Sequence, residues 1–289
     1  VVRELVESAV DAGSAAVIIE VEDGGKRLVR VSDDGEGMSR EDALLAIERH
    51  ATSKIQKIED IENIVTLGFR GEALPSILSV SHALIETRRR EDAFGVRLVI
   101  NGGALKNVTD AGRDAGTDVE IRNLFFNLPA RRKFLKGVDT ELRHVKSIVY
   151  DYIVASPDLS FMLIADGREL ISYRGSGDRT NMLSNIFGES ISALMAPVEL
   201  DAEGIRMKVF VGKPETARAS GFNQFIVLNG RPIRSKSIVR ALLDGYGPML
   251  ARGAFPPFVL YLETDPSRVD VNVHPTKREV RIHREFAFM

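Results

Sequence analysis

A short acidic and glycine-rich stretch has residue types that could read a flat ligand. It runs Asp33-Asp34-Gly35-Glu36-Gly37, directly after an apolar segment. Glycines let the backbone approach a planar group closely, and a carboxylate can accept a hydrogen bond from an exocyclic amino group such as that of adenine. The D-x-G-x-G pattern is equally typical of a turn at a strand end, so it indicates a site only together with other signals.

A second stretch predicts an anion site. Leu67-Gly68-Phe69-Arg70-Gly71-Glu72 is a glycine-flanked loop that leads into an apolar helical pattern ending near Leu78. The free N–H groups and the dipole at a helix N-terminus favour phosphates. The sequence contains no Walker A pattern, so a nucleotide would have to be held in another way.

The opening helical segment, from Glu4 to Gly13, carries a third pattern. Residues four and seven positions apart share one face of a helix, so Glu4, Ser8 and Asp11 form a single column. Taken alone, such a column describes the solvated face of an amphipathic helix.

The elements that must position these residues mix helices and strands. Alternating apolar residues over 16–22, a turn at 23–25 and a strand over 27–31 predict a hairpin. Ser39 and Asp42 resemble a capping box for a helix through Arg49, and the polar stretch 50–57 predicts a loop. Further strands are expected near 82–88, 95–100, 117–122, 159–165, 169–173, 205–212, 222–228 and 257–263, and further helices over 129–154, 179–187 and 235–245.

Length and composition limit the classes of protein. A chain of 289 residues favours two domains, and we place them at 1–185 and 186–289 in an α+β arrangement. The absence of cysteine excludes a disulfide framework or thiolate metal site and favours a cytoplasmic protein. No apolar run could span a bilayer and no signal-like leader is present. Because the sequence opens inside an apparent helix without a Met, we expect a piece of a longer protein.

Charge is distributed less evenly than the net value of −2 indicates. That value does not favour a nucleic-acid partner, and either basic cluster alone is explained by a solvated face. One cluster consists of Arg131, Arg132, Lys133 and Lys136, and the other of Arg231, Arg234, Lys236 and Arg240.

Several motifs in a fixed order give the sequence a recognisable family character. They are ELVE-x-x-x-DAG, D-x-G-x-G, RHATSK, GFRGEAL, Gly116-Thr117, NLPARRKFLK and VDVNVHP-x-K. In this order they closely resemble the N-terminal ATPase region of the MutL DNA mismatch-repair family, within the GHKL superfamily of gyrase B, Hsp90 and histidine kinases. The resemblance covers nearly the whole chain. It implies a GHKL (Bergerat-type) α/β sandwich followed by a smaller ribosomal-S5-like domain, with ATP and Mg²⁺ as cofactors.

The resemblance also implies roles for individual residues. Glu4 matches the general base that activates water, and Lys277 matches a lysine from the second domain that reaches the γ-phosphate. Ser8 stands where the family has an Asn that binds Mg²⁺, and its shorter hydroxyl puts turnover in doubt more than ATP binding. The positions that match ATP-binding residues are Asp33, Gly35, Gly37, Thr52, Ser53, Lys54, Gly68, Phe69, Arg70, Gly71, Glu72 and Thr117. Residues 50–57 match part of an ATP lid.

Family membership further implies partners. MutL-like proteins bind DNA non-specifically in a groove formed when two N-terminal regions dimerise on ATP, and such binding is sensitive to salt. The implied DNA-binding residues are Arg231, Arg234, Lys236 and Arg240, whereas Arg131, Arg132 and Lys133 are equally consistent with a structural role. A MutS-type mismatch-recognition protein and downstream repair enzymes are the other implied partners, with no membrane partner.

Three functions remain open from the sequence. The first is a weak Mg²⁺-dependent ATPase that acts as a switch in mismatch repair. The second is an ATP-gated DNA clamp or scaffold that hardly hydrolyses ATP because of Ser8. A gyrase B-type subunit is disfavoured by GFRGEAL and NLPARRKFLK, and a histidine kinase by the second domain.

Overall fold

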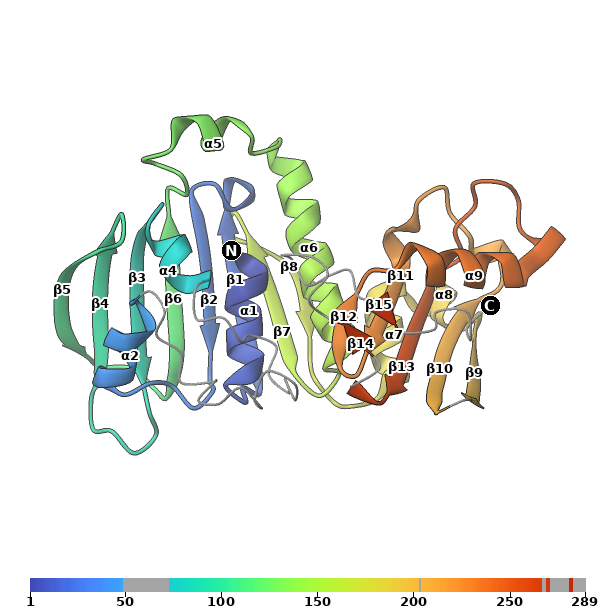
Figure 1. The fold of residues 1–289 in the computed structure, drawn as a ribbon, viewed down its shortest axis with the longest axis horizontal. Helices are drawn as coiled ribbons and strands as arrows, with labels where there is room; N and C mark the ends of the chain where they lie inside the picture. Colours follow the sequence, from blue (N-terminus) through green and yellow to red (C-terminus); the bar gives the residue numbers. More distant parts are fainter. Residues whose placement is uncertain (49–72, 203, 267–268, 271–280, 283–289) are drawn as a thin grey trace. The chain divides into compact units, whose positions relative to one another are not determined.

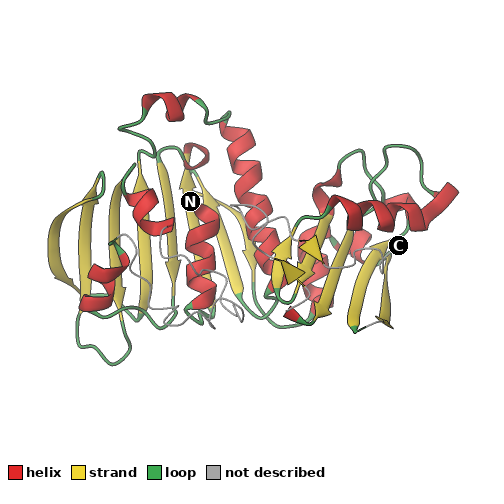
Figure 2. Ribbon diagram, viewed as in Figure 1, coloured by secondary structure: helices red, strands yellow, loops and turns green. Residues whose placement is uncertain are grey.

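The computed structural model describes residues 1–48, 73–202, 204–266, 269–270 and 281–282 (Figure 1). The chain forms two compact units. The first unit contains Val1–Val149 and Asp158–Ser176, and the second contains Tyr150–Pro157 and Gly177–Met289. Each unit combines its own sheet with helices, as the predicted α+β class requires (Figure 2).

The first unit is built on an eight-stranded sheet with the order β5-β4-β3-β6-β2-β1-β7-β8. Only β1 and β7 are parallel neighbours, and the other neighbours run antiparallel. The strands are β1 (Ala16–Glu22), β2 (Leu28–Asp33), β3 (His82–Arg88), β4 (Gly95–Asn101), β5 (Ala104–Ala111), β6 (Gly116–Arg122), β7 (Ser160–Ala165) and β8 (Arg168–Tyr173).

Helices pack on one face of this sheet. Figure 1 shows α1 (Val2–Asp11), α2 (Arg40–Ala46) and α4 (Ala73–Leu78) on the same side of it. Alternation along β1 agrees, because Ile19 is fully buried while Ile18, on the opposite face, is 42% exposed. The open face carries cross-strand ion pairs instead of apolar packing, for example Arg30 to Asp118 at 2.6 Å.

Local signals placed several elements correctly. The hairpin of β1 and β2 turns through the short 3₁₀ helix η1 (Asp23–Gly25), as predicted. Ser39 caps α2, because its Oγ accepts from the Asp42 N–H at 3.0 Å and donates to the Asp42 carboxylate at 2.7 Å. The helix ends at Ala46, before the predicted Arg49, where the Glu48 N–H turns back to the Leu45 carbonyl.

Two elements differ from what the sequence pattern predicted. Strand β5 was not predicted, because it lies at the edge of the sheet and its mostly exposed side chains give no apolar alternation. The single helix predicted over 129–154 is two helices, α5 (Pro129–Lys133) and α6 (Val138–Ala155). The break is held by Glu141, whose carboxylate accepts from the Lys136 N–H at 2.9 Å.

The second unit has a five-stranded sheet with the order β12-β11-β13-β10-β9. Its core lies between this sheet and α9, where Val209, Ile226 and Leu260 are at most 3% exposed and Leu242 packs against them. The elements are α7 (Arg179–Phe187), α8 (Glu189–Ser192), β9 (Met195–Ala202), β10 (Ile205–Gly212), η2 (Pro214–Thr216), η3 (Gly221–Asn223), β11 (Gln224–Leu228), β12 (Arg231–Ile233), α9 (Lys236–Tyr246), η4 (Gly247–Met249), β13 (Phe258–Thr264), and the short pair β14 (Val269–Asp270) and β15 (Arg281–Ile282).

Helix α7, which the sequence pattern placed at the end of the first domain, packs within the second unit. Met182 is fully buried, and its Sδ accepts a hydrogen bond from the Tyr261 hydroxyl at 3.6 Å. The ring of Phe187 lies 6.0 Å from the ring of Phe225. The contacts assign Gly177–Met289 to the second unit together with Tyr150–Pro157. The domain boundary after residue 185 stays a prediction.

No helix in the described ranges is long and apolar enough to cross a membrane.

Candidate functional site

The carboxylate of Asp33 lies at the end of β2, between two backbone donors. Its Oδ1 accepts from the Gly35 N–H at 2.9 Å and from the Thr117 N–H at 3.3 Å. Burial raises the pKa of Asp33 above its ordinary value, and the two N–H donors together with the Arg113 guanidinium oppose that rise. The fold thus holds a half-buried acceptor in a fixed orientation, which is the group that the D-x-G-x-G pattern predicts.

Three glycines in this loop and at the start of β6 stand where the backbone leaves no room for a side chain. A Cβ on Gly35 would lie 2.7 Å from the Ala12 carbonyl oxygen, and one on Gly116 would lie 2.1 Å from that of Asp33. Gly37 has φ +68°, and its Cβ would lie 2.0 Å from the Arg88 carbonyl oxygen. The close neighbours are protein backbone, so packing alone already requires these glycines. Their contact with a ligand stays a prediction.

A chain of hydroxyl groups connects the Thr117 side of the site to the segment after Gly37. Thr117 Oγ1 lies 3.0 Å from Thr87 Oγ1. Thr87 is fully buried, accepts from the Met38 N–H at 2.8 Å and donates to the Gly116 carbonyl at 3.2 Å. Sequence reasoning missed Thr87, because it is a single threonine within a strand and belongs to no motif.

Asp34 anchors the same loop to the chain that follows α1. Its Oδ1 accepts from the backbone N–H groups of Ala15, at 2.7 Å, and Ala16, at 2.9 Å. The Glu36 N–H donates to the carbonyl of Ala12 at 3.0 Å. The loop that carries Asp33 is therefore docked against the end of the helix that carries Glu4 and Ser8.

Helix α1 has the predicted two-sided character. Leu5, Val6 and Ala9 are at most 6% exposed, and the helix packs on β2. Glu4 is half-buried in the first turn, and Ser8, one turn later, is exposed. Two oxygen-bearing side chains thus lie one turn apart outside the packed face.

Several predicted site residues lie outside the described residues. They are Thr52, Ser53, Lys54, Gly68, Phe69, Arg70, Gly71, Glu72 and Lys277. Among the residues that the structure describes, no three His, Asp or Glu side chains gather in a way that could hold a metal ion.

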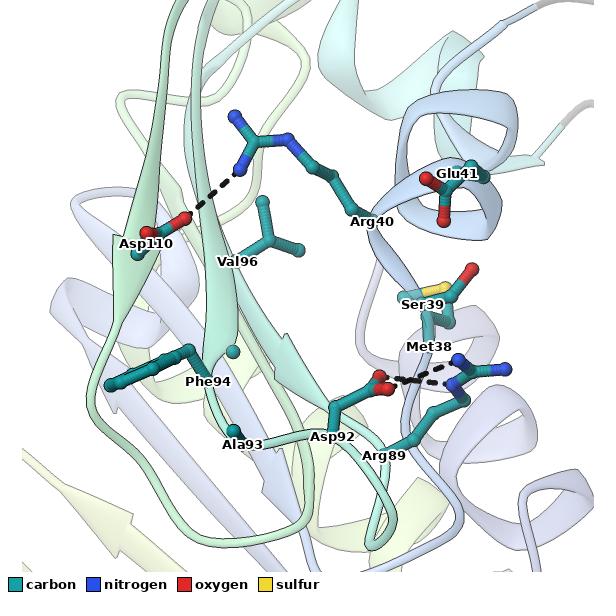
Figure 3. A pocket seen from close by; sticks show the side chains of 11 residues that line it. Met38, Ser39, Arg40, Glu41, Arg89, Asp92, Ala93, Phe94, Val96 and Asp110 are labelled. Atoms are coloured by element: carbon teal, nitrogen blue, oxygen red, sulfur yellow. Dashed lines mark hydrogen bonds and ion pairs between the residues drawn. The ribbon is translucent and has the colours of Figure 1, made fainter.

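A surface hollow of about 320 Å³ follows the Asp33–Gly37 loop in the chain, and none of the predicted site residues lines it (Figure 3). Both arginines that line the hollow are paired with carboxylates: Arg40 donates to Asp110 at 2.9 Å, and Arg89 donates to Asp92 at 3.0 and 3.1 Å. The lining residues are Met38, Ser39, Arg40, Glu41, Arg89, Asp92, Ala93, Phe94, Gly95, Val96 and Asp110.

The predicted DNA-binding residues of the second unit differ in their surroundings. Lys236 and Arg240 are exposed one turn apart on α9, and Arg231 is half-buried on β12. Arg234 donates to the buried carboxylate of Asp151 at 2.6 Å and to a backbone carbonyl of β11. Its contacts hold the fold of the second unit, and its contact with DNA stays a prediction.

Comparisons with known proteins agree with this architecture. Residues 1–110 match the family model described as histidine kinase-, DNA gyrase B- and HSP90-like ATPase. Residues 183–289 match the C-terminal domain of DNA mismatch repair protein. The GHKL fold followed by a smaller S5-like domain is therefore confirmed.

Curated relatives cover almost the whole chain. DNA mismatch repair protein MutL of Geobacter sulfurreducens is 44% identical over 285 residues, which are 99% of this chain and 47% of that protein. MutL of Syntrophotalea carbinolica is 47% identical over 286 residues, which are 99% of this chain and 46% of that protein. The chain thus spans about half the length of the curated relatives it matches.

Solved structures give the same result. The Aquifex aeolicus MutL ATPase domain complexed with ADP has a TM-score of 0.67 and 32% identity, and the match covers 92% of this chain and 90% of that one. The N-terminal domain of a DNA repair protein has a TM-score of 0.84 and 27% identity, covering 99% and 89%. The chain therefore belongs to the MutL family of DNA mismatch-repair proteins.

Proposed function

We propose that this chain binds ATP at Asp33 and uses the bound nucleotide as a switch in DNA mismatch repair. One observation carries the proposal: a half-buried carboxylate is fixed by the Gly35 and Thr117 N–H groups, so it can accept a hydrogen bond from the adenine amino group. The related Aquifex structure described above is a complex with ADP, which supports a nucleotide at this fold.

The proposed ATPase activity is centred on α1. The half-buried Glu4 carboxylate would orient the attacking water and accept its proton. Ser8 presents a hydroxyl oxygen one turn away, a ligand type that suits a hard cation, and Ser8 is the residue of α1 that would hold Mg²⁺. When bound to the triphosphate, Mg²⁺ neutralises charge on the transferred phosphoryl group, and Lys277 is proposed to add a second positive charge there.

ATP turnover tests this assignment. The protein is incubated with ATP and Mg²⁺, and phosphate release is measured for the parent, Glu4→Gln and Glu48→Gln. Glu48 is an exposed glutamate just after α2, so it controls for the loss of one carboxylate. We expect Glu4→Gln to bind ATP and to lose hydrolysis by about 10²- to 10⁴-fold, the usual contribution of a general base. Hydrolysis at the parental rate in Glu4→Gln would show that Glu4 is not the base.

The second candidate function is an ATP-gated clamp that hardly hydrolyses, and the exposed hydroxyl of Ser8 favours it. A hydroxyl is shorter than the Asn amide of the family and needs a bridging water to reach a metal ion. ATP binding and phosphate release are therefore compared for the parent and Ser8→Asn. Turnover that appears only in Ser8→Asn supports the clamp, and comparable turnover in both supports the ATPase.

For the complete protein we propose ATP-dependent dimerisation, non-specific DNA binding, and coupling of a MutS-type mismatch-recognition protein to downstream repair enzymes. Lys236 and Arg240 are the proposed phosphate contacts, since both are exposed one turn apart on α9. Replacing Lys236 with Ala should weaken DNA binding and lower the slope of log K against log salt by about 1. Lys106→Ala, an exposed lysine on β5, serves as the control and should leave the slope unchanged.

A further inference from the structure

The hydrogen-bond partners of Thr87 determine the direction of its own hydroxyl proton. A threonine hydroxyl has one proton to donate and two lone pairs that accept. The Gly116 carbonyl, at 3.2 Å, can only accept, whereas Thr117 Oγ1, at 3.0 Å, can either accept or donate, so the arrangement that makes both bonds directs the Thr87 proton to Gly116. The Met38 N–H can only donate, at 2.8 Å, and it takes one Thr87 lone pair.

The remaining lone pair of Thr87 determines the state of Thr117. Their hydroxyl oxygens lie 3.0 Å apart, and the Thr87 proton is already used. In that arrangement Thr117 donates its own proton to Thr87. Its hydroxyl is left with lone pairs alone, so any further hydrogen bond that it makes is as an acceptor.

Thr117 and Asp33 belong to one hydrogen-bonded unit, because the Thr117 N–H donates to Asp33 Oδ1 at 3.3 Å. We propose that Thr87 is a positioning residue that sets base specificity by making the Thr117 hydroxyl an acceptor beside the Asp33 carboxylate. Two acceptors favour a base with an amino group at C6, which is adenine. They disfavour a base with a carbonyl there, which is hypoxanthine or guanine. This inference rests on the proposed binding of ATP.

A merely structural Thr87 would have a different signature. Its three bonds join β3, β6 and the segment after Gly37, so its loss would loosen the site for every nucleotide. If Thr87 directs the Thr117 proton, its loss changes the relative affinity for nucleotides with an amino group and with a carbonyl at C6. Without Thr87 Oγ1 the Thr117 hydroxyl can turn and donate to a C6 carbonyl.

The test compares ATP with inosine triphosphate, in which the C6 amino group is replaced by a carbonyl. Affinities of both nucleotides are measured by calorimetry for the parent, Thr87→Val and Thr87→Ser. Valine keeps the shape of threonine without the hydroxyl, whereas serine keeps the hydroxyl. We expect the ratio of ATP affinity to inosine triphosphate affinity to fall about 3- to 10-fold in Thr87→Val, which is the usual contribution of one hydrogen bond. In Thr87→Ser this ratio should stay at the parental value.

Two outcomes contradict the inference, and a third contradicts the proposed function on which it rests. An equal loss for both nucleotides in Thr87→Val shows that Thr87 is structural. A lowered ratio in Thr87→Ser shows that the hydroxyl is not the cause. Failure of the parent to bind ATP contradicts the proposed function itself, whereas parental binding with an unchanged ratio in Thr87→Val contradicts only the role of Thr87.

A second measurement needs no variant and so does not depend on whether Thr87→Val folds. Neutron diffraction from deuterated parent crystals locates the deuteron between the two threonine oxygens. We expect it on Thr117 Oγ1, directed at Thr87. A deuteron on Thr87 Oγ1 directed at Thr117 would overturn the inference.

Discussion

Replacing Gly37 with Ala should destabilise the first unit strongly, because the new Cβ would lie 2.0 Å from the Arg88 carbonyl oxygen. Real Cβ atoms keep at least about 3 Å from such neighbours, so Arg88 must move by about 1 Å. Arg88 ends β3 and pairs with Gly116, so the movement would reach the neighbouring strand. We expect about 1–2 kcal/mol for alanine in the left-handed region and about 1–3 kcal/mol for the displaced backbone.

Gly167→Ala is a matched control in the same unit. Gly167 lies in the turn between β7 and β8 with φ +76°, and a Cβ there would meet nothing within 4 Å. It carries the conformational cost of about 1–2 kcal/mol without the collision. The difference between the two variants, about 1–3 kcal/mol, therefore isolates the close approach of Gly37 to Arg88.

Urea unfolding followed by far-ultraviolet circular dichroism measures both variants. Tryptophan fluorescence is not an option, because the sequence contains no tryptophan. An unfolding free energy for Gly37→Ala equal to or above that of Gly167→Ala would refute the packing assigned to the Asp33–Gly37 loop.

Three further predictions concern charged residues. Burial raises the pKa of Asp33, so the folded state holds the Asp33 proton more tightly than the unfolded state does. The stability of Asp33→Asn relative to the parent should therefore rise from pH 3 upward and level off above the folded-state pKa. Urea unfolding of both proteins between pH 3 and 7 measures this difference, and a difference that shrinks as pH rises would contradict the prediction. Asp34→Ala should cost about 0.5–1.5 kcal/mol through the loss of two exposed hydrogen bonds, whose N–H groups water can then take, while Asp34→Asn should cost less. Equal losses for the two variants in thermal unfolding would contradict the anchoring role. Arg234→Ala should cost about 1.5–3 kcal/mol because it removes the guanidinium that donates to the buried carboxylate of Asp151. The exposed Arg240→Ala should cost under about 0.5 kcal/mol, and similar melting temperatures for the two variants would contradict the difference.

Local signals predicted much of the fold. The hydroxyl of Ser39 and the acid three residues later were sufficient to place the start of α2, and alternating apolar residues with a glycine turn were sufficient for the first hairpin. Edge strand β5 gave no such signal, because few of its side chains are buried. An Asn101-Gly102 turn before it was the one available cue.

The site was predictable only where motifs carry it. Asp33 was found because it stands in D-x-G-x-G, and the structure explains its fixed orientation by a donor, Thr117, that lies 84 residues away. Thr87 was not found, because its partners Met38 and Thr117 lie 49 and 30 residues away and meet only in the folded sheet. Sequence periodicity reports on neighbours along one element, so contacts of this kind require the tertiary structure.

The most direct test of the central claim is the affinity of the parent and of Asp33→Asn for ATP and GTP, measured by calorimetry with Mg²⁺. Asparagine can keep the backbone bonds from Gly35 and Thr117 but loses the charge that the adenine amino group would meet. We predict that the parent prefers ATP and that Asp33→Asn, still folded, binds ATP about 10- to 150-fold more weakly, the worth of a hydrogen bond to a charged group. Equal ATP affinity in the two proteins would contradict the assignment of Asp33 as the residue that reads the base.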